Sequence, residues 1–135
     1  MVTDIFVNLS VKDLPKTKEF FQKLGLSFNP QFTDDKGACL VLGDHIFVML
    51  LTEPFFKTFI KKEIADASKT TEVINAIGVG SKKEVDEMVD KALAAGATKY
   101  KEADDYGWMY SRSFQDIDGH LWEVLYADIS KFPKQ

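Results

Sequence analysis

The pattern of hydrophobic and polar positions repeats once along the chain. Apolar runs at 5–11 and 73–79 are each followed by a short polar residue suited to a helix N-cap, Asp13 or Ser81. A helical pattern follows each cap and stops at a glycine, and strand-like segments then lead to a second apolar strand. The sequence therefore predicts two tandem β-α-β-β-β modules.

Three helical segments are predicted. The first runs from about Leu14 to Leu24, with apolar residues at helical spacing. The second follows Ser81, where Ser81 and Glu84 have the spacing of a capping box. The third, from Pro54 to about Ala67, carries several phenylalanines, and the pattern leaves open whether it is a core helix or a flap over a cavity.

The length of the chain predicts one domain over residues 1–135, of the α+β class. We expect a first module at 1–53, a linker helix at 54–70 and a second module at 71–128. A chain of 135 residues, 45% hydrophobic and 28% charged, has the length and composition of a soluble globular domain with its own core.

Charge and cysteine content narrow the classes of partner. A formal net charge of −4 indicates neither a nucleic-acid surface nor a surface for anionic membranes. The single cysteine, Cys39, cannot form an internal disulfide, and no apolar run approaches the roughly 20 residues that span a bilayer. We therefore expect a cytoplasmic protein without nucleic-acid or membrane partners.

The alternation of residues along the last predicted strand places one carboxylate, Glu123, on an apolar face. Residues two apart on a strand share a face, so Glu123 shares a face with Leu121 and Leu125. An isolated charge on an apolar face is costly unless it is paired, hydrogen-bonded or exposed to water. We therefore predict that Glu123 lies in or beside a cavity.

The chain resembles the vicinal oxygen chelate superfamily, which includes glyoxalase I, bleomycin and fosfomycin resistance proteins, and extradiol dioxygenases. The similar parts are the tandem repeat, the segment VKDLPKTKEFFQKLGL and the run from Asp116 to Val124. The family's closing hairpin reads D-P-D-G-x-x-x-E, and here only the proline is replaced, by Ile117. The resemblance implies tandem modules that form a curved, cup-like mixed sheet, the glyoxalase/bleomycin resistance/dihydroxybiphenyl dioxygenase fold.

The hairpin also has a physical explanation of its own. Asp116 can cap the turn with a side-chain oxygen, and Gly119 can adopt the positive φ that the turn requires. Glu123 then lies within the following strand.

The family's metal site can be tested position by position. In glyoxalase-like members the hairpin glutamate binds a divalent metal together with one side chain from each of three other strands. The resemblance places Phe6, Met49 and Ile74 at those positions and leaves Glu123 as the only matching ligand. A phenyl ring and an alkyl chain cannot coordinate a metal, and a thioether is a poor ligand for hard or borderline divalent ions. We predict no metal site and no cofactor.

Alternation and the resemblance together predict a ligand cavity. Its apolar residues are Phe6, Phe47, Met49 and Ile74, and its polar residues are Asn8, Ser10, Ser111, Ser113 and Glu123. Apolar walls with a few polar groups suit recognition of a small molecule. Alternation places Arg112 on the helix side of its strand, although its length could let it reach a rim or a partner chain.

Three functions follow as alternatives. The first is a small-molecule-binding protein of the bleomycin-resistance type that lacks a complete metal site. The second is a lyase or isomerase like lactoylglutathione lyase, in which Glu123 would be catalytic and a divalent metal would be required. The third is a structural or interaction protein whose cavity is filled by side chains. In each case we expect a homodimer, because the edges of curved half-sheets are liabilities unless they are paired.

Overall fold

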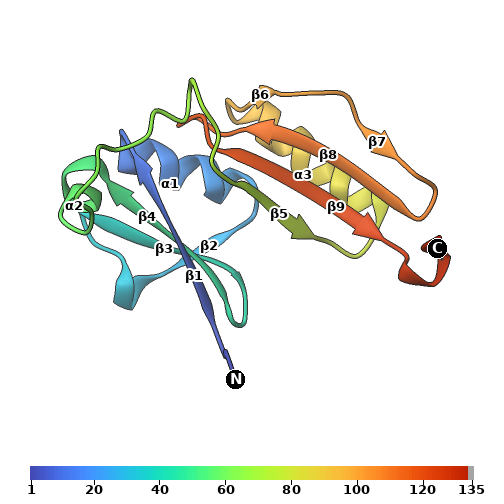
Figure 1. Ribbon diagram of the computed structural model, residues 1–135, viewed down its shortest axis with the longest axis horizontal. Helices are drawn as coiled ribbons and strands as arrows, with labels where there is room; N and C mark the ends of the chain where they lie inside the picture. Colours follow the sequence, from blue (N-terminus) through green and yellow to red (C-terminus); the bar gives the residue numbers. More distant parts are fainter. Residues whose placement is uncertain (134–135) are drawn as a thin grey trace. The chain divides into compact units, whose positions relative to one another are not determined.

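The computed structural model describes residues 1–133, which divide into two compact units at Asp66 and Ala67. Each unit contains one β-α-β-β-β motif with its own mixed sheet (Figure 1). The predicted tandem modules and the α+β class are therefore confirmed. Among the described residues, no helix is long and apolar enough to cross a membrane.

The first unit is a four-stranded sheet with one main helix. Strand β1 lies parallel to β4, and the other neighbouring strands are antiparallel, in the order β1-β4-β3-β2. Its elements are β1 (Ile5–Val11), α1 (Leu14–Lys23), β2 (Ser27–Asn29), the 3-10 helix η1 (Pro30–Phe32), β3 (Gly37–Gly43), β4 (Ile46–Thr52) and the short helix α2 (Glu53–Lys57).

The second unit repeats this topology and adds one short strand. Strand β5 lies parallel to β9 in the order β5-β9-β8-β6, and β7 also pairs with β8. Its elements are β5 (Ile74–Gly78), α3 (Lys82–Ala94), β6 (Thr98–Lys99), β7 (Asp104–Asp105), β8 (Met109–Gln115), β9 (Leu121–Ala127) and the 3-10 helix η2 (Ile129–Lys131).

Helix α1 closes the core of the first unit. The Asp13 side chain accepts a hydrogen bond from the backbone N–H of Lys16, as expected of an N-cap. The apolar stripe of the helix is buried and comprises Leu14, Phe20, Phe21 and Leu24. The predicted helix and its buried face are confirmed.

The apolar face of β1 is buried at only one end. Leu9 and Val11 are buried, whereas Ile5 and its neighbour on β4, Ile46, are 54% and 49% exposed. The core of the first unit therefore does not cover the start of this strand.

Helix α3 covers one face of the second sheet and contacts both β8 and β9. Its buried residues Val85, Val89 and Ala92 belong to the same core as Trp122 and Phe114. We call the sheet face opposite α3 the open face of the second unit.

The predicted capping box at the start of α3 is partly formed. The Ser81 hydroxyl accepts a hydrogen bond from the backbone N–H of Glu84, as a capping box requires. The Glu84 carboxylate, however, accepts from the backbone N–H of Gly80, one residue before the expected partner.

The linker helix is shorter than predicted. Helix α2 ends at Lys57, so the expectation of a helix over 54–70 is wrong in its length, and none of its residues is buried. After it, Thr58 donates its hydroxyl to the carbonyl of Phe55, and the backbone N–H groups of Thr58 and Phe59 bond three residues back. Such bonds compete with the four-residue spacing of an α-helix and end it.

Candidate functional site

The predicted cavity residues fall into two groups. Five lie in the first unit, at Phe6, Asn8, Ser10, Phe47 and Met49, and four lie in the second unit, at Ile74, Ser111, Ser113 and Glu123.

In the first unit, strand register places the five residues on one face of the sheet. Phe6 lies beside Phe47 and Asn8 beside Met49 in the parallel β1–β4 pair. The rings of Phe6 and Phe47 stack with their centroids 4.8 Å apart and their planes 14° apart. Phe6 is nevertheless 53% exposed. This face is therefore an aromatic surface at the position where glyoxalase-like proteins place a ligand to metal.

Asn8 and Cys39 lie on the same face of the first sheet, on either side of Met49. The Asn8 side-chain amide donates a hydrogen bond of 3.2 Å to the Phe6 carbonyl. Cys39 pairs with Met49 across β3 and β4 and is buried. Burial raises the pKa of the Cys39 thiol, which disfavours the reactive thiolate. Cys39 therefore has the environment of a small buried apolar residue.

In the second unit, the four predicted residues lie together on the open face. Ser113 lies directly opposite Glu123 on the antiparallel strands β8 and β9, and Ser111 lies opposite Leu125. Ile74 pairs with Leu121 at the β5 edge and is 58% exposed.

Ser113 is the unusual residue of this face. It is only 7% exposed, and its hydroxyl oxygen has no hydrogen-bond partner among the described residues. A buried hydroxyl without a partner costs free energy, and such groups are uncommon in folded proteins. Its neighbour across the strands, Glu123, is half-buried. A polar ligand group at this position would satisfy the Ser113 hydroxyl.

Sequence reasoning missed two charged residues on the same side. Asp104 on β7 lies opposite Ser111, and its carboxylate accepts a hydrogen bond of 2.5 Å from the Lys101 ammonium. This bond raises the pKa of Lys101 above its ordinary value. The negative charges of Asp104 and Glu123 add to the effect. The Lys101 ammonium therefore interacts electrostatically with both carboxylates. No regular period marks it, because it lies between two very short strands.

The closing hairpin is held by one carboxylate, as predicted. The Asp116 oxygen Oδ1 accepts hydrogen bonds from the backbone N–H groups of Asp118 and His120, at 2.9 and 3.0 Å. Its other oxygen accepts a bond of 2.9 Å from the Trp122 indole N–H. Gly119 has a φ of 88°, as the turn requires. These contacts fix where Glu123 enters β9.

The helix side of β8 carries a separate polar network. Arg112 lies 3.0 Å from one carboxylate oxygen of Asp86 and 3.0 Å from one of Asp90, both on α3. The Tyr110 hydroxyl donates a bond of 2.6 Å to Asp86. The prediction that Arg112 faces the helix is confirmed, and its charge is used in holding α3 to the sheet.

The residues that the resemblance assigns to the family's metal positions carry few donor atoms. Among residues 1–133, no group of three or more His, Cys, Asp and Glu side chains is arranged to hold a metal ion. Phe6 stacks on another phenylalanine, and Ile74 has no donor atom, so Glu123 would contribute one carboxylate alone. His45 binds Asp4 at 2.7 Å on the exposed surface of the first unit.

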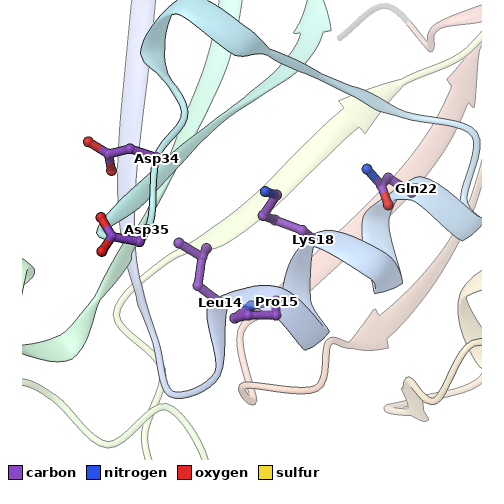
Figure 2. A pocket seen from close by; sticks show the side chains of 6 residues that line it. All are labelled: Leu14, Pro15, Lys18, Gln22, Asp34 and Asp35. Carbon is purple, nitrogen blue, oxygen red and sulfur yellow. The ribbon is translucent and has the colours of Figure 1, made fainter.

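A hollow of about 340 Å3 lies elsewhere on the first unit, between α1 and the loop before β3 (Figure 2). It is lined by Leu14, Pro15, Lys18, Gln22, Asp34 and Asp35. Figure 2 shows the two carboxylates directed away from the helix. Asp34 accepts hydrogen bonds from the backbone N–H groups of Lys36 and Gly37, so its carboxylate shapes the loop. None of the predicted site residues lines this hollow.

Comparison with known families agrees with the fold. The Glyoxalase/Bleomycin resistance protein/Dioxygenase superfamily matches residues 5–124, and the chain belongs to this superfamily. No protein with a curated description matches the sequence.

Solved structures share the fold of this chain. The hypothetical protein SA1046 from S. aureus is 29% identical with a TM-score of 0.79, over 94% of this chain and 95% of that one. A glyoxalase/bleomycin resistance protein/dioxygenase family enzyme from Burkholderia phytofirmans is 17% identical with a TM-score of 0.74, over 90% and 96% of the two chains. The fosfomycin resistance protein FosX from Listeria monocytogenes is 21% identical with a TM-score of 0.68, over 100% and 97%.

Proposed function

We propose that this chain is a small-molecule-binding protein of the glyoxalase/bleomycin-resistance type that works without a complete metal site. The observation that carries the proposal is the buried Ser113 hydroxyl, which lacks a partner among the described residues and lies opposite Glu123. A ligand with a polar group here would replace the missing hydrogen bond and meet the half-buried carboxylate.

The open face of the second unit has the mixture that small ligands need. Ser111 and Ser113 offer hydroxyls beside Glu123, while Leu121 and Leu125 flank the carboxylate along β9. Apolar side chains contribute shape and contact area, and a few polar groups fix the orientation of the ligand.

We do not propose a metal-dependent lyase, because the chain has few metal-binding atoms at the positions that the resemblance assigns to ligands. Glyoxalase-type catalysis needs several oxygen or imidazole ligands around one ion. At the corresponding positions this chain has Phe6, Met49 and Ile74 with Glu123. One carboxylate does not hold a catalytic metal, so we place Glu123 in ligand recognition.

A structural or interaction role, in which side chains fill the binding face, is the second candidate function. The stacked rings of Phe6 and Phe47 occupy the face of the first sheet on which a ligand would lie. If this stack fills the site, the protein has a structural or interaction role. Binding of small molecules separates the two candidates.

A thermal-shift screen of the metal-stripped protein tests the proposal. Nickel, zinc, manganese and cobalt are assayed separately from a panel of small amphipathic compounds, because a ligand that binds only the native state raises the melting temperature. We expect stabilisation by members of the compound panel and none by the ions. Stabilisation by an ion, together with ion-dependent turnover of a hemithioacetal, would support the lyase instead. A protein unaffected by every compound and ion would support the filled face.

A further inference from the structure

We propose that the open face of the second unit binds an amphipathic zwitterion, with the ligand's ammonium at Glu123 and its carboxylate or other oxyanion at Lys101. This inference rests on the proposed small-molecule function and names the class of ligand for the same face. It comes from the order of charged and hydroxyl side chains across the sheet.

The charged groups lie on both sides of a serine pair. Asp104 on β7 holds Lys101 and lies opposite Ser111, while Glu123 on β9 lies opposite Ser113. Strand β8 carries both serines and separates β7 from β9. Neighbouring strands are about 4.8 Å apart, so the backbones of β7 and β9 are separated by roughly 10 Å. The four-carbon Lys101 side chain is long enough to reduce the separation between its ammonium and Glu123.

The placement of the charges favours a ligand that carries both signs. Lys101 pairs with Asp104 on one side of the two serines, and the negative charge of Glu123 lies on the other side. An ammonium has three N–H donors, and the bond to Asp104 uses one of them. Lys101 can therefore also donate to a ligand anion. A purely anionic ligand would bring its charge close to Glu123 without neutralising it, and a purely cationic ligand would make no use of Lys101.

Two further features suit such a ligand. The Ser113 hydroxyl can both donate and accept, so it can bond to either charged end of the zwitterion. Leu121 and Leu125 flank Glu123 on the same face, and Ala76 lies opposite it on β5. A short apolar group of the ligand, between or beside its two charged groups, would contact these side chains.

Four compounds with the same aromatic body test the charge requirement. They are L-phenylalanine with both charges, phenethylamine with only the ammonium, 3-phenylpropionate with only the carboxylate, and 3-phenylpropanol with neither. Binding to the full-length protein is measured by calorimetry and by amide shifts in the NMR spectrum. We expect L-phenylalanine to bind at least about tenfold more tightly than each analogue and to shift the amides of Ser113 and Glu123.

Lys101→Met is the decisive variant, because methionine keeps most of the length of the side chain and removes its charge. We expect it to remove the preference for L-phenylalanine over phenethylamine and not to weaken phenethylamine binding, because the carboxylates of Asp104 and Glu123 remain. Lys99→Met is the matched control. Lys99 also pairs with an exposed carboxylate, Glu102, at 2.7 Å, and it lies opposite Phe114, whose side chain is on the helix side. We expect the control to bind all four compounds as the parent does.

The outcomes separate the two proposals. Equal binding of all four compounds at the Ser113 and Glu123 amides would overturn the zwitterion and leave small-molecule binding intact. Binding of L-phenylalanine by Lys101→Met as tightly as by the parent would likewise overturn the zwitterion and leave small-molecule binding intact. If L-phenylalanine shifts no amide on this face up to its solubility limit, the zwitterion is contradicted. The proposed function then depends on the wider compound panel.

Discussion

Gly119 is the residue on which the closing hairpin depends most directly. Its φ of 88° lies in the left-handed region, which side chains with a Cβ rarely adopt. An added Cβ would also come within 3.0 Å of the backbone of Ala67 and Ser68. The turn thus needs glycine for both conformation and space.

We therefore expect Gly119→Ala to lower the free energy of unfolding more than Gly107→Ala does. Gly107 has a similar φ of 82°, but an added Cβ there meets no atom within 4 Å. The control should lose about 1–2 kcal/mol from conformation alone, and Gly119→Ala about 1–3 kcal/mol more from crowding. Urea unfolding of both variants measures the difference. Equal losses would mean that the backbone near Ala67 moves aside without cost.

At the scale of elements, the contact of α3 with β8 depends on a polar network. Tyr110 donates a hydrogen bond to Asp86, and Arg112 lies between Asp86 and Asp90. The bond from Tyr110, followed by those from Arg112, holds the pKa of Asp86 below its ordinary value of 3.8. The folded protein therefore keeps this carboxylate charged at a pH at which the unfolded chain takes up a proton.

The stabilisation from Asp86 is accordingly present above pH 3.8 and is lost as the pH falls through the lower pKa of the folded state. We expect Asp86→Asn to lower the melting temperature at neutral pH and to flatten its decline below about pH 4. Glu87→Gln is the control, because Glu87 pairs with Lys83 on the exposed surface of the same helix. If both variants show the parent's pH profile, the Asp86 network does not stabilise the unit.

Long elements could be predicted from the sequence because their patterns are strong. The caps at Asp13 and Ser81 and the strand at 5–11 were readable from residue type and spacing. Strand β7 was not readable, because two aspartates have low β propensity and form a strand only by pairing with β8. The end of α2 was missed because it depends on the Thr58 hydroxyl, which acts locally.

The residues of the candidate site that lie on regular strands could be predicted, because the alternation of those strands is clear in the sequence. Alternation along β8 and β9 was enough to place Ser111, Ser113 and Glu123 on one face. Lys101 and Asp104 were not predictable, since their position depends on how an irregular segment returns to the edge of β8. The carboxylate of Glu123 on an apolar strand face, together with a lysine in the irregular segment between β6 and β7, is the signal that would have suggested them.

At the scale of the whole molecule, we expect a homodimer. Strands β1 and β5 are edge strands of their sheets, and exposed apolar residues lie on them, including Ile5, Phe6 and Ile74. Unpaired edges with apolar side chains favour association with another chain. Sedimentation at micromolar concentration should give a species of twice 15.3 kDa.

A matched pair of variants assigns the interface. We expect Phe6→Ser to weaken the dimer, because Phe6 is at an edge strand and half its surface is exposed. Phe32→Ser should leave the dimer unchanged, since Phe32 is even more exposed than Phe6 but lies in η1 and not on an edge strand. A parent protein that sediments only as a 15.3 kDa monomer would contradict the expectation.

The most direct test of the central proposal is the affinity of Glu123→Gln for a compound from the screen, measured in metal-free buffer. The variant keeps the shape of the side chain and removes its charge. We predict an unchanged fold and dimer and a loss of about 1.5–3 kcal/mol in binding, the contribution of a hydrogen bond to a charged group. Glu102→Gln, at an exposed carboxylate of the same unit, should bind as the parent does. If Glu123→Gln binds every identified ligand as tightly as the parent, Glu123 is structural and the proposed site is wrong.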